Sequence, residues 1–247
     1  MKSIFKINPV TYFLVLSVLL CGYFNYFLVI FIILFFHECG HLLIIKLFKL
    51  ELAKIEILPF GAIIKLDLQS NISSVKLLLI SSFGVVMQMF LYVPFLFFYN
   101  NGFITELTYN IFLTYNKFII LFNIMPIVPL DGSKILGSVL EMIMPYKLNL
   151  KLINLLSIIA ILGFAKVSEF NLSLIIIICF LVVETFKLVR NHNYIFNSFL
   201  LERYLYDIKH RRVKNVKSIN QIYKNYYNFI NNVKERDVLY SKFKPFN

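Results

Sequence analysis

Residues 37–41 of this 247-residue chain read His-Glu-Cys-Gly-His, a composition and spacing typical of a zinc site. On a helix with 3.6 residues per turn, His37 and His41 lie on the same face and can bind one Zn²⁺. Glu38 adjoins them and can take a proton from a metal-bound water, as in the H-E-x-x-H metalloproteases. Because zinc lowers the pKa of such a water to about 7, the motif predicts hydrolytic chemistry with one zinc ion per chain.

A catalytic zinc usually has three protein ligands and one open position, so a third ligand is expected. Asp131 is the best candidate, because the proline-interrupted segment 123–132 lies at the cytoplasmic end of a predicted span, at the same depth as His37 and His41. Pro126 and Pro129 should break the helix there and free backbone carbonyls, which a membrane tolerates only beside a cavity or under protein. Asn123, with Pro126, is predicted to orient a substrate carbonyl or to stabilise an oxyanion. The alternative for Asp131 is a helix N-cap.

The elements that must position these groups are membrane helices. Of all residues, 59% are apolar and 15% are charged, whereas soluble domains average about 25% charged residues. This balance excludes soluble, disordered, collagenous and disulfide-framework classes. The sequence therefore predicts an all-α polytopic membrane protein with about six transmembrane helices, at 9–24, 27–48, 77–99, 109–125, 152–165 and 172–189.

Basic residues gather in every second connection between the predicted spans, so they lie on one side of the membrane. Lysines precede the first predicted span and gather at 46–76 and 134–151, and more basic residues follow the last span. The positive-inside rule then places both chain termini in the cytoplasm. Within the loop at 46–76, residues 54–58 and 63–68 alternate apolar and polar side chains around a Pro-Phe-Gly-Ala turn. This pattern predicts a small membrane-associated β-hairpin on the cytoplasmic side.

The last 57 residues differ in character from the rest, with 11 basic and four acidic residues and no glycine. We therefore predict two parts, an intramembrane domain at 1–190 and a basic cytoplasmic tail at 191–247, in which a helix begins near 196–212. A basic segment beside a membrane favours contact with the anionic lipid bilayer or an acidic protein over direct contact with nucleic acid.

Two other interpretations compete with a hydrolytic zinc site. The polar groups could simply hold buried helices together. Alternatively, the chain could be a zinc or divalent-metal transporter that uses the same His, Glu and Asp side chains. A transporter needs ligands across the whole bilayer, whereas the outer halves of the predicted spans contain no His or Asp. This distribution favours a single site near one face, with peptide-bond hydrolysis as its reaction.

The segments 37–41 and 123–132 together resemble the site-2 protease family of intramembrane metalloproteases. That family carries H-E-x-x-H on one span and N-x-x-P-x-x-x-x-D-G on a later one, and both patterns occur here in that order. The resemblance covers roughly residues 1–205 and implies that His37, His41 and Asp131 bind zinc while Glu38 is the base. A further family motif, Gly-Pro-x-x-Asn, corresponds to residues 84–88, where Val and Gln replace its Pro and Asn.

Within this family, the six-span layout, the short first loop and the basic segment 199–204 resemble a sporulation subgroup. That resemblance implies regulated intramembrane proteolysis of a membrane-associated protein substrate, a pro-sigma factor. It also implies membrane inhibitor proteins as possible partners and a location in the mother-cell membrane around the forespore.

Overall fold

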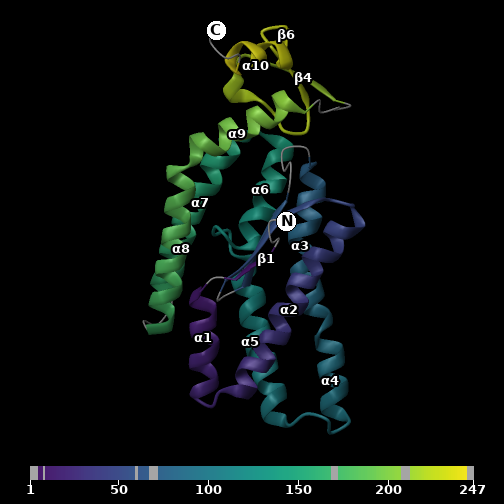
Figure 1. Cartoon of the computed structure of the whole chain (residues 1–247), viewed down its shortest axis with the longest axis vertical. Coiled ribbons are helices and arrows are strands. Elements are labelled where there is room, and N and C mark those ends of the chain that lie inside the picture. Colours follow the sequence, from purple (N-terminus) through teal and green to yellow (C-terminus); the bar gives the residue numbers. More distant parts are fainter. Residues whose placement is uncertain are drawn as a thin grey trace. The chain divides into compact units, whose positions relative to one another are not determined.

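The chain is mostly α-helical, with two small three-stranded sheets (Figure 1). The computed structural model describes residues 5–7, 9–58, 61–66, 72–167, 172–206 and 212–243. The chain divides into two compact units, residues 1–67 with 79–123 and residues 68–78 with 124–247.

Three helical segments among the described residues are long and apolar enough to cross a membrane: Phe24–Leu47, Ser74–Asn100 and Tyr146–Lys166. They overlap the predicted spans 27–48, 77–99 and 152–165. The predicted span 9–24 corresponds to a helix of 12 residues, which is shorter than the roughly 20 residues that a transmembrane helix needs. The other two predicted spans correspond to helices of 19 residues. The complete six-span layout therefore stays a prediction.

The first unit contains most of the helices that flank the His-Glu-Cys-Gly-His segment. Its elements are α1 (Pro9–Leu20), α2 (Phe24–Leu47), most of α3 (Ser74–Phe90), α4 (Tyr92–Asn100) and α5 (Glu106–Ile124). Along α2 the buried side chains recur every three or four residues, at Val29, Ile33, His37, His41 and Ile44, so one face of this helix is turned inward. That face ends in a cluster of buried apolar residues in which the rings of Phe95 and Phe112 stack.

The predicted hairpin is confirmed as β2 (Leu52–Leu58) and β3 (Gly61–Leu66), which pair antiparallel. Its turn at Pro59 and Phe60 and the end of its predicted second strand at 67–68 lie outside the described residues. The sequence did not predict a third strand, β1 (Phe5–Ile7), which pairs with β2 in parallel. Among the described residues β3 pairs with β2 alone, so it is an edge strand of this sheet.

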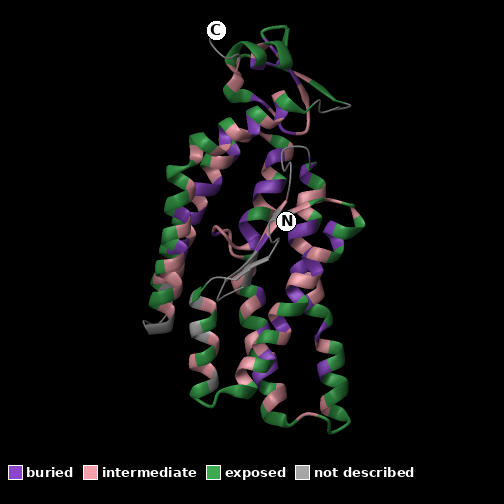
Figure 2. Ribbon diagram, viewed as in Figure 1, coloured by how far each residue is buried: buried purple, intermediate pink, exposed green. Residues whose placement is uncertain are grey.

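The second unit contains α6 (Asp131–Ile143), α7 (Tyr146–Val167), α8 (Leu172–Arg190) and α9 (His192–Leu205). Helices α6, α7 and α8 follow one another as packed neighbours. Most described positions of α8 are exposed or half-buried (Figure 2). The exposed positions include large apolar side chains such as Ile176, Val183 and Phe186. An exposed apolar surface of this kind is what a lipid-facing helix requires.

The tail folds into more than a basic helix. Helix α9 overlaps the helix predicted near 196–212, and it is followed by β4 (Val213–Val216), a 3₁₀ helix (Ile219–Gln221), β5 (Tyr227–Ile230), β6 (Val233–Lys234) and α10 (Glu235–Phe243). Strand β5 lies between β4, in parallel, and β6, in an antiparallel hairpin. The hairpin turn is Asn231-Asn232, both with positive φ, as a type I′ turn requires. These elements enclose a core that includes Phe199, Leu200, Ile222 and Leu239.

A buried ion pair holds this C-terminal fold together. The Arg203 guanidinium on α9 contacts both carboxylate oxygens of Glu235 on α10, and it also donates to the carbonyls of Lys224 and Tyr226 at 2.9 Å. Both charged side chains are almost fully buried. Glu235 also accepts hydrogen bonds from the backbone amide and from Nδ2 of Asn228, at 3.1 and 3.0 Å.

Replacing Glu235 with Gln should destabilise the C-terminal fold by about 3–5 kcal/mol, because it leaves a buried guanidinium without its counter-charge. Hydrogen–deuterium exchange of the full-length protein in detergent measures this as lost protection of the β5 amides. The matched control is Asp237→Asn, since Asp237 is two residues away on α10 and exposed. Unchanged β5 protection in Glu235→Gln would show that the ion pair is not what stabilises this fold.

Candidate metal centre

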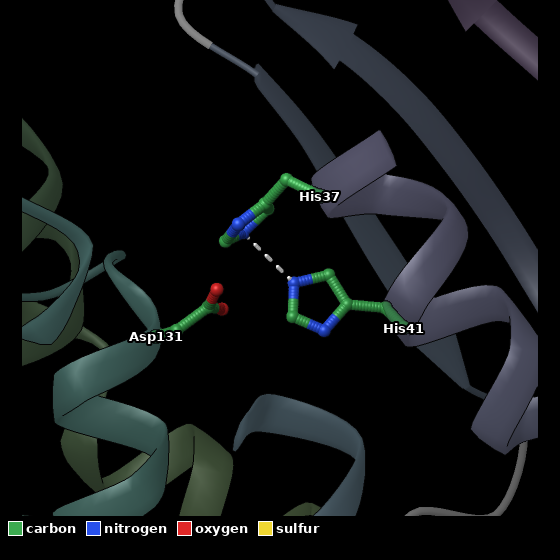
Figure 3. A group of neighbouring side chains, drawn as sticks. All are labelled: His37, His41 and Asp131. Atoms are coloured by element: carbon green, nitrogen blue, oxygen red, sulfur yellow. Dashed lines mark hydrogen bonds between the residues drawn. The ribbon is translucent and has the colours of Figure 1, made fainter. Parts of the chain in front are cut away.

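Helix α2 presents His37 and His41 one turn apart on its buried face. Only 3% and 7% of their surfaces are exposed, and their Nε2 atoms lie 3.1 Å apart, as the dashed line in Figure 3 marks. The spacing of four residues brings both rings to the same side of the helix. The rings are nearly perpendicular to each other, at 85°.

The opposite nitrogen of each ring is held by helix α3. Nδ1 of His41 lies 2.7 Å from the backbone carbonyl of Ile80, and Nδ1 of His37 lies 3.1 Å from Oε1 of Gln88. Oxygens of carbonyl and amide groups only accept hydrogen bonds, so each Nδ1 carries the proton and donates it. When both rings are neutral, their Nε2 lone pairs therefore face each other.

Two glycines allow α2 and α3 to approach this closely. A Cβ atom at Gly40 would lie 2.4 Å from the carbonyl oxygen of Phe83, and one at Gly84 would lie 2.5 Å from Cε1 of His41. Real Cβ atoms do not come so near to other heavy atoms, so these positions require glycine. Small residues at facing positions are a general means of bringing membrane helices together.

Asp131 is the first residue of helix α6, which follows the predicted break in the helical structure. Helix α5 ends at Ile124 and α6 starts at Asp131, which confirms the helix break expected around Pro126 and Pro129. Backbone groups in the break are satisfied by buried Ser157 of α7, whose hydroxyl donates to the carbonyl of Pro126 and accepts from the amide of Val128. Such a contact is one way for a membrane protein to compensate a broken helix.

The carboxylate of Asp131 is placed where a negative charge is favourable. It is 5% exposed and accepts an ion-paired hydrogen bond of 2.9 Å from Lys134. It also occupies the first turn of α6, where the helix dipole stabilises an anion. The N-cap is Leu130, with extended backbone, so the alternative interpretation of Asp131 as N-cap is wrong. The ionised form is the one that a metal ligand requires.

Potential ligand atoms of His37, His41 and Asp131, one from each residue, all lie within 4.8 Å of one another (Figure 3). Glu38 follows the first of these residues on α2 and is half-buried. Asn123, in the last turn of α5, and Pro126 are half-buried and are not members of this group of three. Their part in substrate binding stays a prediction.

The donor set fits zinc, for which two imidazole nitrogens and one carboxylate are common ligands. When both rings are neutral, two Nε2 lone pairs at 3.1 Å would repel each other, and a cation held by both would remove that repulsion. Two nitrogens bound to one tetrahedral zinc at about 2.0–2.1 Å would lie about 3.3 Å apart. The observed separation is close to this value, so these rings need little movement to share one ion.

Gln88 and Ser157 contact the predicted site residues but were not predicted as site residues. Both are fully buried, and both lie in predominantly apolar helices. A polar side chain within a membrane span is costly and by default suggests a role. That criterion would have drawn attention to both residues. It does not indicate which polar group each contacts, because that depends on how the helices pack.

The comparisons with known proteins point to one family. No family model matches the chain. The chain is 26% identical over 202 residues to stage IV sporulation protein FB of Bacillus subtilis (strain 168), a match that covers 80% of this chain and 70% of the relative. Its fold is similar to that of the site-2 protease from Methanocaldococcus jannaschii, with a TM-score of 0.55 and 21% identity, over 76% of this chain and 92% of the other.

Proposed function

Since the chain is a member of the site-2 protease family, we propose that it is an intramembrane zinc metalloprotease. The observation that carries this proposal is the pair of facing Nε2 atoms on α2, each on a ring whose other nitrogen is already engaged. In this proposal the two histidines and Asp131 hold one zinc ion per chain. The carboxylate of Glu38 is the general base.

Zinc, when bound, would polarise the scissile carbonyl and lower the pKa of the attacking water. The chain's own contribution begins with Glu38, whose carboxylate takes a proton from that water and passes it to the nitrogen of the leaving amine. Asn123, supported by the interrupted backbone at Pro126, orients the substrate carbonyl or donates to the developing oxyanion. Burial of the histidines limits competing water around the reaction.

The substrate segment must be extended at the cleavage site, because a helix shields its carbonyls in its own hydrogen bonds. Edge strand β3 could bind the extended substrate segment, since the backbone groups on the outer side of this strand can pair with an added strand. We propose that the substrate lies along β3 by such β-augmentation. Its specificity then comes from side chains at alternate positions of the bound segment.

The similarity to a sporulation protein supports a proposal for the biological setting. We propose that the substrate is a membrane-associated pro-sigma factor, that membrane inhibitor proteins regulate the enzyme, and that it lies in the mother-cell membrane around the forespore. In this proposal the chain has six spans with both termini in the cytoplasm, and the tail at 191–247 follows a membrane domain at 1–190. In this proposal the protein contacts the lipid bilayer and does not bind nucleic acid directly.

Metal analysis of the purified full-length protein tests the site directly. We expect one zinc per chain in the native protein. Asp131→Ala should lower zinc affinity by at least about 100-fold, because loss of a ligand exceeds the 10–100-fold cost of losing an outer partner. Asp237→Asn, which changes an exposed carboxylate on α10, is the matched control. A metal-free native protein, or an Asp131→Ala variant with normal zinc affinity, would contradict the proposed centre.

Co-expression with a membrane-associated pro-sigma factor then separates a protease from a transporter. Shortening of the substrate on a blot, blocked by the zinc chelator 1,10-phenanthroline, supports the protease. Zinc flux into proteoliposomes without shortening of the substrate would favour the transporter and overturn the proposal.

A further inference from the structure

Gln88 is a buried amide whose neighbours along the helix, at 85–87 and 89–90, are apolar. It lies on α3, one turn after Gly84, and none of its surface is exposed. An amide in such a place costs free energy unless all its hydrogen-bonding groups have partners. Its contacts should therefore explain why this side chain is there.

The contacts with α5 fix which way the amide points. Nε2 of Gln88 donates to the backbone carbonyl of Asn116 at 3.2 Å, and Nδ2 of Asn116 donates back to the backbone carbonyl of Gln88 at 3.5 Å. A carbonyl cannot accept from an amide oxygen, so the nitrogen end of Gln88 must face α5. The oxygen end is left facing α2, 3.1 Å from Nδ1 of His37.

This orientation selects one tautomer of His37. An amide oxygen offers no proton, so Nδ1 must carry one, and in the neutral ring Nε2 then carries the lone pair. His41 obtains the same tautomer from a backbone carbonyl, that of Ile80. The two histidines thus differ in one respect: the partner of His41 is part of the main chain, whereas the partner of His37 is a side chain that substitution can remove.

We propose that Gln88 is the positioning residue of the metal centre. It accepts the Nδ1 proton of His37, sets the rotation of that ring and makes Nε2 a better ligand, without touching the metal itself. Outer partners of this kind orient metal-bound histidines and raise their basicity. The inference rests on the proposed zinc site and assigns a function to a residue outside the three ligands and the base.

Two substitutions at this position separate hydrogen bonding from packing. Gln88→Met keeps a similar length and volume and removes the acceptor, and it should weaken zinc binding by about 10–100-fold. Gln88→Glu keeps an acceptor for Nδ1 and should bind zinc at least about tenfold more tightly than Gln88→Met. The control is Gln221→Met, which replaces an exposed glutamine of the C-terminal fold.

The readouts are zinc affinity, from competition with a fluorescent chelator, and the visible absorption bands of the Co²⁺-loaded protein. Both are measured on the full-length protein in detergent. A changed His37 ring alters the Co²⁺ bands of Gln88→Met, which a purely structural loss of packing would not do while the fold is kept. We expect shifted bands in Gln88→Met and bands near the wild-type positions in Gln88→Glu.

The outcomes distinguish this inference from the proposed function. If the wild-type protein binds neither zinc nor Co²⁺, the proposed metal centre itself fails. If the wild type binds zinc and Gln88→Met binds it equally tightly with unchanged Co²⁺ bands, only the role of Gln88 is overturned. Equal losses of affinity in Gln88→Met and Gln88→Glu would also overturn it, because an acceptor at this position would then make no difference.

Discussion

Glu38→Gln should abolish detectable peptide-bond hydrolysis while the protein still holds its zinc. The amide has nearly the same shape as the carboxylate, but it cannot take a proton from the attacking water or return one to the leaving nitrogen. Loss of a general acid–base group typically lowers the rate by about 10²–10⁴-fold. The zinc content should not change, because the proposed ligand atoms belong to His37, His41 and Asp131.

The measurement pairs a cleavage assay on the co-expressed substrate with metal analysis of the same preparation. Glu51→Gln provides a matched control, since this exposed residue follows α2 closely and undergoes the same chemical change. It should cleave and bind zinc like the wild type. Near-normal cleavage by Glu38→Gln would mean that another group is the base, whereas loss of zinc would mean that Glu38 helps to hold the metal.

The local geometry of the centre was predictable because it depends on short-range rules. Four-residue spacing on a helix places His37 and His41 together whatever surrounds them. Prolines at 126 and 129 end a helix for steric reasons, and the helical structure is indeed interrupted there before Asp131. Likewise, the alternation of polar and apolar residues was enough to predict the β2–β3 hairpin.

Features that depend on contacts between distant segments were not predictable in this way. Strand β1 is only three residues long, and its parallel pairing with β2 joins Phe5 to Ile55. The strands of the C-terminal fold have two to four residues each, too few to produce a clear alternation. Basic composition predicted a cytoplasmic tail with one helix, whereas apolar residues spread along this tail form a core together with α9.

The segment 84–88, which corresponds to the family motif Gly-Pro-x-x-Asn, also depends on contacts between distant segments. Its glycine is explained by close contact with the histidine rings and its glutamine by a bond to His37. Neither role can be read from residues 84–88 alone, because both depend on which face of α3 meets α2. The sequence locates a polar residue in a span, and only the packing identifies its partner.

Gly84→Ala should remove zinc from the protein while leaving most of the fold intact. The added Cβ would lie 2.5 Å from Cε1 and 2.6 Å from Nε2 of His41, and 2.8 Å from Cε1 of His37. The groups that must yield are therefore the two imidazoles, not the helix backbone. Because displacement by about 1 Å at a reacting centre can cost 10²-fold in rate, we expect at least that loss of cleavage together with much weaker zinc binding.

Gly163→Ala is the control for the effect of alanine itself. Gly163 lies within α7, and a Cβ there would meet nothing within 4 Å. Alanine is the better helix former by about 0.5–1 kcal/mol, so this variant should be at least as stable as the wild type and fully active. Gly84 also lies within a helix and gains the same helix propensity on substitution. A loss confined to Gly84→Ala therefore measures the crowding of the two rings, whereas full zinc affinity in that variant would mean that the rings lie elsewhere.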